Sequence, residues 1–99
     1  MKISLHAPKL KGKEIHYLKE CIKSTWLSSS GNFVKLFEKK IANYTKTKFA
    51  IGCINGTSAL QVSLNLAGVR PGHEVIVPTV TFIAPINAVK YNGADPIFI

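Results

Sequence analysis

The pattern of apolar residues changes near residue 48, and this change constrains the fold more than any other feature of the sequence. Beyond it, short apolar runs alternate with stretches of helical periodicity, which is typical of βαβ units built around a parallel sheet. The runs predict strands at residues 49–54, 74–77 and 96–99, separated by helices at 57–67 and 82–91. The second half of the sequence therefore predicts an α/β fold.

The first half has a different pattern, in which apolar residues recur at the spacing of amphipathic helices. One helix is predicted at residues 14–25 and a second at 33–45, with the polar segment 28–32 between them. No repeat, low-complexity stretch or linker interrupts the chain. We therefore expect one compact unit, in which a helical segment (1–46) leads into the start of a sheet (47–99).

The chain is strongly basic, with a formal charge of +8, and eleven of its twelve lysines lie at or before Lys48. Lysines bind nucleic acid by releasing counterions from its phosphate backbone. These lysines, however, have no aromatic stacking residues or recognisable binding motif beside them. We expect them to lie on solvated faces and to attract phosphorylated small molecules rather than nucleic acid. A small basic domain that binds nucleic acid or phosphometabolites stays open as an alternative function.

The two cysteines, Cys21 and Cys53, form no CxxC pair and have no histidine at ligand spacing. They predict neither a metal site nor a disulfide, and we expect reduced, mostly buried thiols. The start of the chain has no apolar signal region, and no later run approaches the roughly 18 apolar residues that span a bilayer. We therefore expect a cytoplasmic protein with no membrane partner.

The most informative local feature is the segment from Asn55 to Ala59, which lies between a predicted strand and a predicted helix. Gly56 lets the backbone approach a ligand closely, and a helix start offers unpaired amides and a positive dipole end. The hydroxyls of Thr57 and Ser58 add further donors. These residues form a candidate phosphate cradle, although the segment is neither a Walker A loop nor GxGxxG. An ordinary turn followed by a helix cap explains the same residues equally well.

A second candidate, Phe82, follows the predicted strand 74–77 in the next loop. Ligands of open α/β sheets bind beyond the carboxyl ends of the strands, where this loop and the Gly56 loop are both expected. Phe82 is thus a candidate to face a planar ligand that the first loop holds. The alternative is that Phe82 belongs to the core.

Taken together, short motifs cover nearly all ninety-nine residues in a fixed order. They are WLSSSG at 26–31, FE at 37–38, NGTSAL at 55–60, PGHEVIVP at 71–78, TFIA at 81–84, NAV at 87–89 and GADP at 93–96. In this order and spacing they resemble the DegT/DnrJ/EryC1/StrS family of sugar aminotransferases.

The resemblance implies a fold-type-I, aspartate-aminotransferase-like enzyme, with this chain as the N-terminal part of its large domain and an incomplete parallel or mixed sheet with flanking helices. Such enzymes move an amino group from an amino acid, usually glutamate, to a keto sugar carried on a nucleotide. They act in the biosynthesis of amino sugars and surface polysaccharide, and they are usually homodimers.

The resemblance also assigns roles to residues. The family cofactor is pyridoxal 5′-phosphate, whose phosphate is held by the loop matching Gly56, Thr57 and Ser58. The aromatic residue matching Phe82 stacks on the pyridine ring of the cofactor. The segment near the substrate matches Trp26, Ser28, Ser29 and Gly31.

The family's Schiff-base lysine and the aspartate that pairs with the pyridine nitrogen come downstream of these motifs. Lys90 and Asp95 match neither position, and we expect Lys90 on the surface. Pro85 stands where many relatives have a small hydroxyl residue, so it receives no binding role. Some relatives carry histidine in place of the lysine and eliminate water, which leaves a sugar dehydratase as an alternative. We expect a truncated chain that is inactive and unstable alone, because strand 49–54 lacks its neighbour.

Overall fold

The structure, a computed structural model, describes residues 6–99. Residues 1–5, which belong to the start that lacks an apolar run, lie outside the described residues. The chain divides into two units, Met1–Ala50 and Ile51–Ile99, so the expectation of a single compact unit is wrong. No helix within the described part of the chain is long and apolar enough to cross a bilayer.

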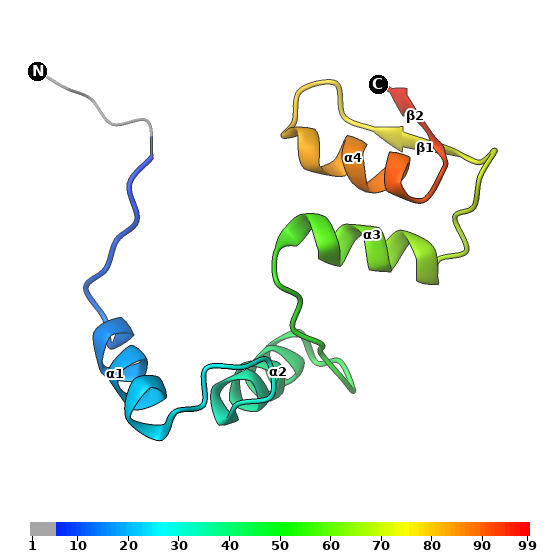
Figure 1. Ribbon diagram of the computed structural model, residues 1–99. Coiled ribbons are helices and arrows are strands. Elements are labelled where there is room, and N and C mark those ends of the chain that lie inside the picture. The colour runs from blue at the N-terminus through cyan, green and yellow to red at the C-terminus, as the bar shows by residue number, and fades with distance from the viewer. Residues whose placement is uncertain (1–5) are drawn as a thin grey trace, which may run out of the picture. The chain divides into compact units, whose positions relative to one another are not determined.

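The first unit is helical, as its periodicity predicts. It contains α1 (Glu14–Ser24) and α2 (Asn32–Thr45), whose bounds agree with the predicted helices to within one residue (Figure 1). The rings of Tyr17 and Phe33 meet edge to face with their centroids 5.2 Å apart. This aromatic contact joins α1 to the first turn of α2.

The second unit is a βαβ arrangement with one additional helix in front. Its elements are α3 (Gly56–Leu66), β1 (Glu74–Val77), α4 (Ile83–Tyr91) and β2 (Asp95–Phe98). The two strands pair in parallel, with Val77 opposite Phe98. The predicted parallel pairing and the helical crossover are therefore confirmed. The bounds of each element agree with the predicted bounds to within one residue.

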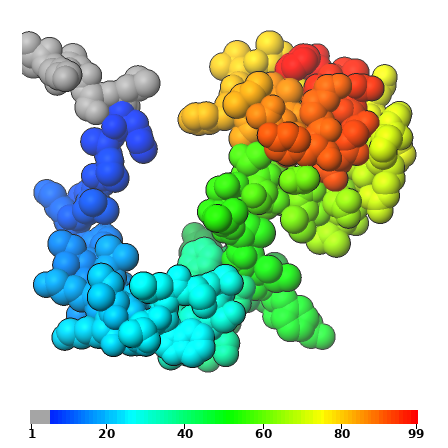
Figure 2. All heavy atoms as spheres, viewed as in Figure 1, coloured from blue at the N-terminus to red at the C-terminus, as the bar shows by residue number. Residues whose placement is uncertain are grey.

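The core of the second unit is small and lies where the helices meet the sheet. α3 packs along α4, and α4 packs against both strands; the space-filling view shows the atoms of α3 directly against those of α4 (Figure 2). Val77, Val89 and Ala94 are buried at the centre of this core. The partly buried residues around them are Leu64, Val69, Val75 and Ile86.

The turn from α4 into β2 requires glycine at position 93. Gly93 has a φ of 73°, in the left-handed region that side chains rarely adopt. A Cβ atom on this residue would also lie 2.8 Å from Cγ of Pro71. The close approach of Pro71 and the left-handed backbone together make any larger residue destabilising here.

Residues 49–54 do not form the predicted strand. Within the described residues the sheet contains only β1 and β2, so this segment has no neighbouring strand to complete its backbone hydrogen bonds. Its apolar side chains are correspondingly exposed, Phe49 by 74% and Ile54 by 91%. Cys53 lies in the same segment and is exposed, and Cys21 is half-buried, so the expectation of mostly buried thiols is wrong.

Candidate functional site

The first turn of α3 carries the candidate phosphate cradle. Asn55 caps this helix: its Oδ1 accepts a hydrogen bond from the Ser58 amide at 2.9 Å, and its carbonyl accepts one from the Ala59 amide at 3.1 Å. The amides of Gly56 and Thr57 precede the first intrahelical bond and have no helical acceptor. The cap interpretation of this segment is therefore confirmed, and two amides beside the cap stay free of helical partners.

The Gly56 position is open on the side where a side chain would project. A Cβ atom built on Gly56 meets no other atom within 4 Å, and the residue does not have a positive φ. Neither the packing nor the backbone conformation of this chain therefore demands glycine here. The residue leaves room for a group from outside to approach the two amides, which fits a phosphate.

Phe82 is exposed and lies outside the core of the second unit, which is centred on Val77, Val89 and Ala94. It is the N-cap residue of α4, and 87% of its surface is accessible. The loop that carries it is tied to the end of β2, because the Thr79 amide and Oγ1 donate to the Ile99 carbonyl at 2.9 and 2.7 Å. Pro85 lies in the first turn of α4, where its missing N–H breaks no helical bond.

The two candidate parts of the cofactor site lie at one end of the second unit. α3 and α4 run in the same direction and begin at the same end, next to the end of β1 (Figure 1). The free amides therefore open one helix and Phe82 opens its neighbour. This is the arrangement expected where ligands bind beyond the carboxyl ends of parallel strands.

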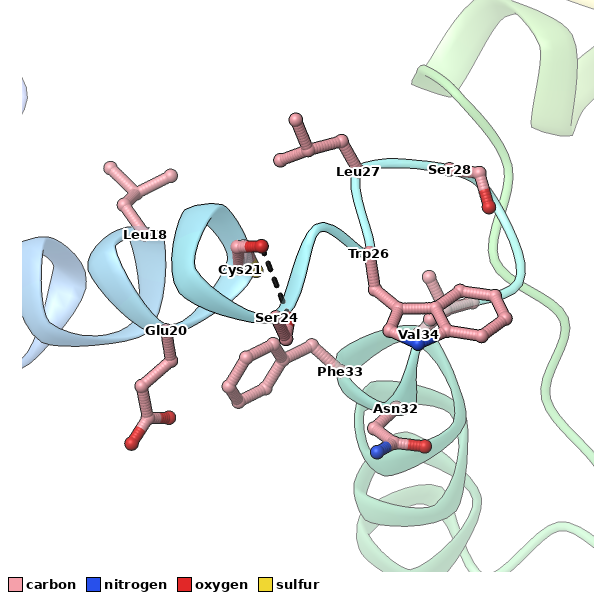
Figure 3. Close-up of a pocket in the computed structure, with 11 residues that line it drawn as sticks. Leu18, Glu20, Cys21, Ser24, Trp26, Leu27, Ser28, Asn32, Phe33 and Val34 are labelled. Carbon is pink, nitrogen blue, oxygen red and sulfur yellow. Dashed lines mark hydrogen bonds between the residues drawn. The ribbon is translucent and has the colours of Figure 1, made fainter.

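A pocket of about 400 Å³ lies in the first unit, where α1 is followed by the start of α2 (Figure 3). Three of the four residues predicted to lie near the substrate line it: Trp26, Ser28 and Gly31. Ser29 is exposed and does not line it. Gly31 is buried, and a Cβ atom here would lie 3.9 Å from Cβ of Trp26, in ordinary van der Waals contact.

Other residues line the same pocket without having been predicted. They are Leu18, Glu20, Cys21, Ser24, Leu27, Asn32, Phe33 and Val34. Most of them come from the last turns of α1 and the first turn of α2, so only the packing of the two helix ends reveals them. In Figure 3 the Trp26 indole lies over the first turn of α2, beside Val34.

Two charged groups of the second unit, Lys90 and Asp95, pair with each other. Lys90 is exposed, as predicted, and its Nζ pairs with Oδ1 of Asp95 at 2.6 Å. Within residues 6–99 no three histidine, cysteine or acidic side chains are close enough to hold a metal ion together.

Comparison with known proteins identifies the family. The sequence profile of the DegT/DnrJ/EryC1/StrS aminotransferase family matches residues 8–99. The chain belongs to this family. It is 48% identical over 97 residues to GDP-perosamine synthase of Escherichia coli O157:H7, a match that covers 98% of this chain and 27% of that protein. GDP-perosamine synthase of Caulobacter vibrioides is 49% identical over 98 residues, which is 99% of this chain and 26% of that protein.

Solved structures of aminotransferases confirm the predicted fold class. The aminotransferase from Psychrobacter cryohalolentis matches with a TM-score of 0.78 and 34% identity, over 92% of this chain and 23% of that one. A Streptococcus pneumoniae protein described as a sugar aminotransferase in its PLP form matches with a TM-score of 0.88 and 29% identity, over 100% of this chain and 25% of that one. The chain thus spans about a quarter of the length of the relatives it matches.

Proposed function

We propose that this protein is a pyridoxal-phosphate-dependent aminotransferase that moves an amino group from an amino acid, with glutamate the first donor to test, to a nucleotide-linked keto sugar. The observation that carries the proposal is the near-complete match of the chain to a family of sugar aminotransferases, at 48% and 49% identity to two GDP-perosamine synthases. Other relatives are also named as transaminases of nucleotide sugars, which favours amino transfer over the dehydratase alternative.

The residues at the start of α3 fit the cofactor's phosphate. We assign the amides of Gly56 and Thr57 and the hydroxyls of Thr57 and Ser58 to this group, because a helix N-terminus suits a phosphate dianion. The Ser58 amide is excluded from this role, since it already donates to Asn55. Asn55 therefore supports the cradle by holding the first turn in place.

Phe82 fits the cofactor's ring. Its side chain is exposed at the start of α4, so its face can cover a flat heteroaromatic ring without any rearrangement of the core. When bound, pyridoxal phosphate supplies the electron sink that amino transfer requires. The role of this chain is then to hold the phosphate at α3 and to orient the ring against Phe82.

We assign Trp26, Ser28, Ser29 and Gly31 to the neighbourhood of the substrate. The pocket beside Trp26 offers an aromatic face, which suits the apolar face of a sugar or a base, and the Ser28 hydroxyl as a hydrogen-bonding group. Because two relatives are named for GDP-perosamine, we propose a GDP-linked keto sugar as the first substrate to test. We further propose a homodimer, as the family resemblance implies, and a location in the cytoplasm.

The experiment uses the full-length natural protein loaded with pyridoxal phosphate. Amino-¹⁵N-labelled glutamate and a GDP-linked keto sugar are supplied, and mass spectrometry follows the label. We expect ¹⁵N to appear on the sugar nucleotide. If the label stays on glutamate with GDP-linked, UDP-linked and dTDP-linked keto sugars alike, the proposed reaction is wrong. Size-exclusion chromatography with light scattering tests the dimer, and cell fractionation tests the location.

A further inference from the structure

Asn92 links the two helices that carry the candidate cofactor site. It follows the last turn of α4 and is half-buried. Its side-chain Nδ2 donates one hydrogen bond to the Ala88 carbonyl of its own helix at 2.8 Å and another to the Gln61 carbonyl of α3 at 3.1 Å. Gln61 lies in the middle of α3, so the second bond ties the end of one helix to the centre of the other.

We propose that Asn92 is a positioning residue that fixes α3 against α4 and thereby sets the spacing between the phosphate-binding amides and Phe82. This inference rests on the proposed function, in which one cofactor touches both. α3 and α4 begin at the same end of the unit, and Asn92 joins them at a distance from that end (Figure 1). A shift or rotation of α3 along α4 would move Gly56 and Thr57 relative to Phe82.

The apolar contacts between the helices do not define this spacing by themselves. The buried residues of α4 are Ala88 and Val89, which are small, and apolar burial has no preferred direction. A hydrogen bond, in contrast, weakens steeply when its angle or distance changes. The bond from Asn92 to Gln61 therefore adds a directional contact against sliding to the apolar packing of Leu64 and Ile86.

The chemistry at Asn92 is also specific for an amide. Both N–H groups of Nδ2 are used, and both acceptors are main-chain carbonyl oxygens. A carboxylate of the same shape has no hydrogen to donate and would place an oxygen against these two oxygens. Asn92→Asp thus reverses the interaction at nearly constant volume, and Asn92→Ala removes it without adding charge.

A ligand that is held at two places is sensitive to their spacing. When two subsites are fixed relative to each other, contact at one raises the effective concentration of the ligand at the other. Loosening the link between α3 and α4 lowers this effective concentration and leaves each subsite intact. The loss therefore affects a ligand that spans both subsites and spares a ligand that uses only one.

The test measures binding to the full-length protein by calorimetry with three probes. Pyridoxamine 5′-phosphate spans both subsites and forms no imine with a lysine, inorganic phosphate reports on α3, and pyridoxine reports on the Phe82 face. In Asn92→Asp and Asn92→Ala we expect pyridoxamine phosphate to bind at least about fivefold more weakly, with phosphate and pyridoxine within about twofold of the natural protein. Asn43→Asp, on the exposed surface of α2, makes the same chemical change elsewhere and should alter none of the three.

Two outcomes overturn the inference. Unchanged affinity for pyridoxamine phosphate in both variants means that Asn92 does not set the spacing. An equal loss for all three probes in both variants means that Asn92 supports folding in general. If the natural protein itself fails to bind pyridoxamine phosphate, the proposed function is wrong and the inference falls with it, so the two failures are distinguishable.

Discussion

Exchanging the cap residue of α3 for an acid should change stability and cofactor affinity in opposite directions. Asn and Asp are about equally good helix caps, so Asn55→Asp keeps the hydrogen bond to the Ser58 amide. A negative charge at a helix N-terminus adds about 0.3–1 kcal/mol of stability. The same charge lies beside the amides of Gly56 and Thr57, where we place the cofactor's phosphate.

The magnitude of the repulsion follows from the geometry of the cap. Oδ1 of Asn55 is 2.9 Å from the Ser58 nitrogen, so a phosphate on the two preceding amides would lie roughly 6 Å from a carboxylate at this position. Two unit charges at that distance repel by about 3 kcal/mol at an effective dielectric constant of about 20. Allowing for salt screening at an exposed site, we expect pyridoxamine phosphate to bind about 10–100-fold more weakly.

The control places the same charge at the other end of the same helix. Asn65 is exposed in the last turn of α3, ten residues from Asn55 and therefore about 15 Å away along the helix axis. This exceeds the Debye length of about 10 Å at 0.1 M salt, so Asn65→Asp should leave the affinity unchanged. Calorimetry measures both affinities, and thermal unfolding measures both stabilities. Unweakened binding of pyridoxamine phosphate by Asn55→Asp would refute the assignment of its phosphate to this helix start.

Three further predictions concern the second unit. Phe82→Ala should weaken the binding of pyridoxamine phosphate about 2–10-fold, because the ring stacking is lost. The melting temperature should stay unchanged, because Phe82 is 87% exposed. Phe82→Trp keeps an aromatic face and should keep the affinity. Gly93→Ala should destabilise the protein by about 1–3 kcal/mol in denaturant unfolding, because its Cβ would meet Pro71 at 2.8 Å and its φ is 73°. Lys90→Ala should lower the stability of the protein by less than about 1 kcal/mol, because the pair of Lys90 with Asp95 is exposed. The affinity for pyridoxamine phosphate should stay unchanged, because this pair lies outside the proposed cofactor site. A loss of affinity would mean that Lys90 had been wrongly excluded from that site.

The sequence predicted those elements whose signals are local. Helical periodicity and the turn residues around them placed both helices of the first unit, and the apolar run between Gly72 and Pro78 placed β1. Residues 49–54 carry an equally clear apolar run, yet they form no strand, because a strand exists only when a neighbour supplies its hydrogen bonds. The apolar pattern of a segment indicates its tendency to form a strand, but it does not indicate whether a neighbouring strand is present to pair with it.

The parts of the site that were predicted also have local sequence signals, whereas the parts that only the structure reveals depend on contacts between distant residues. Gly56 to Ser58 and Phe82 were found from short motifs. Gly56 and Phe82 are exposed, Thr57 and Ser58 are half-buried, and the helices that they open begin at the same end of the unit, which agrees with the proposed roles. A turn followed by a helix cap was one of two interpretations of this segment, and the hydrogen bond from the Ser58 amide to Oδ1 of Asn55 shows that the cap is present. The bond from Asn92 to Gln61 spans 31 residues, and no local pattern in the sequence contains it.

The exposure of the candidate site is itself consistent with a role in binding. Phe82 is 87% exposed at the start of α4, and the Gly56 position has no neighbour within 4 Å that would exclude a side chain. Both residues therefore lie outside the core of the second unit, which is centred on Val77, Val89 and Ala94. An exposed residue of a loop that completes a family motif fits a role in binding. Because α3 and α4 begin at the same end of the unit, a single ligand with an anionic and an aromatic part accounts for both residues.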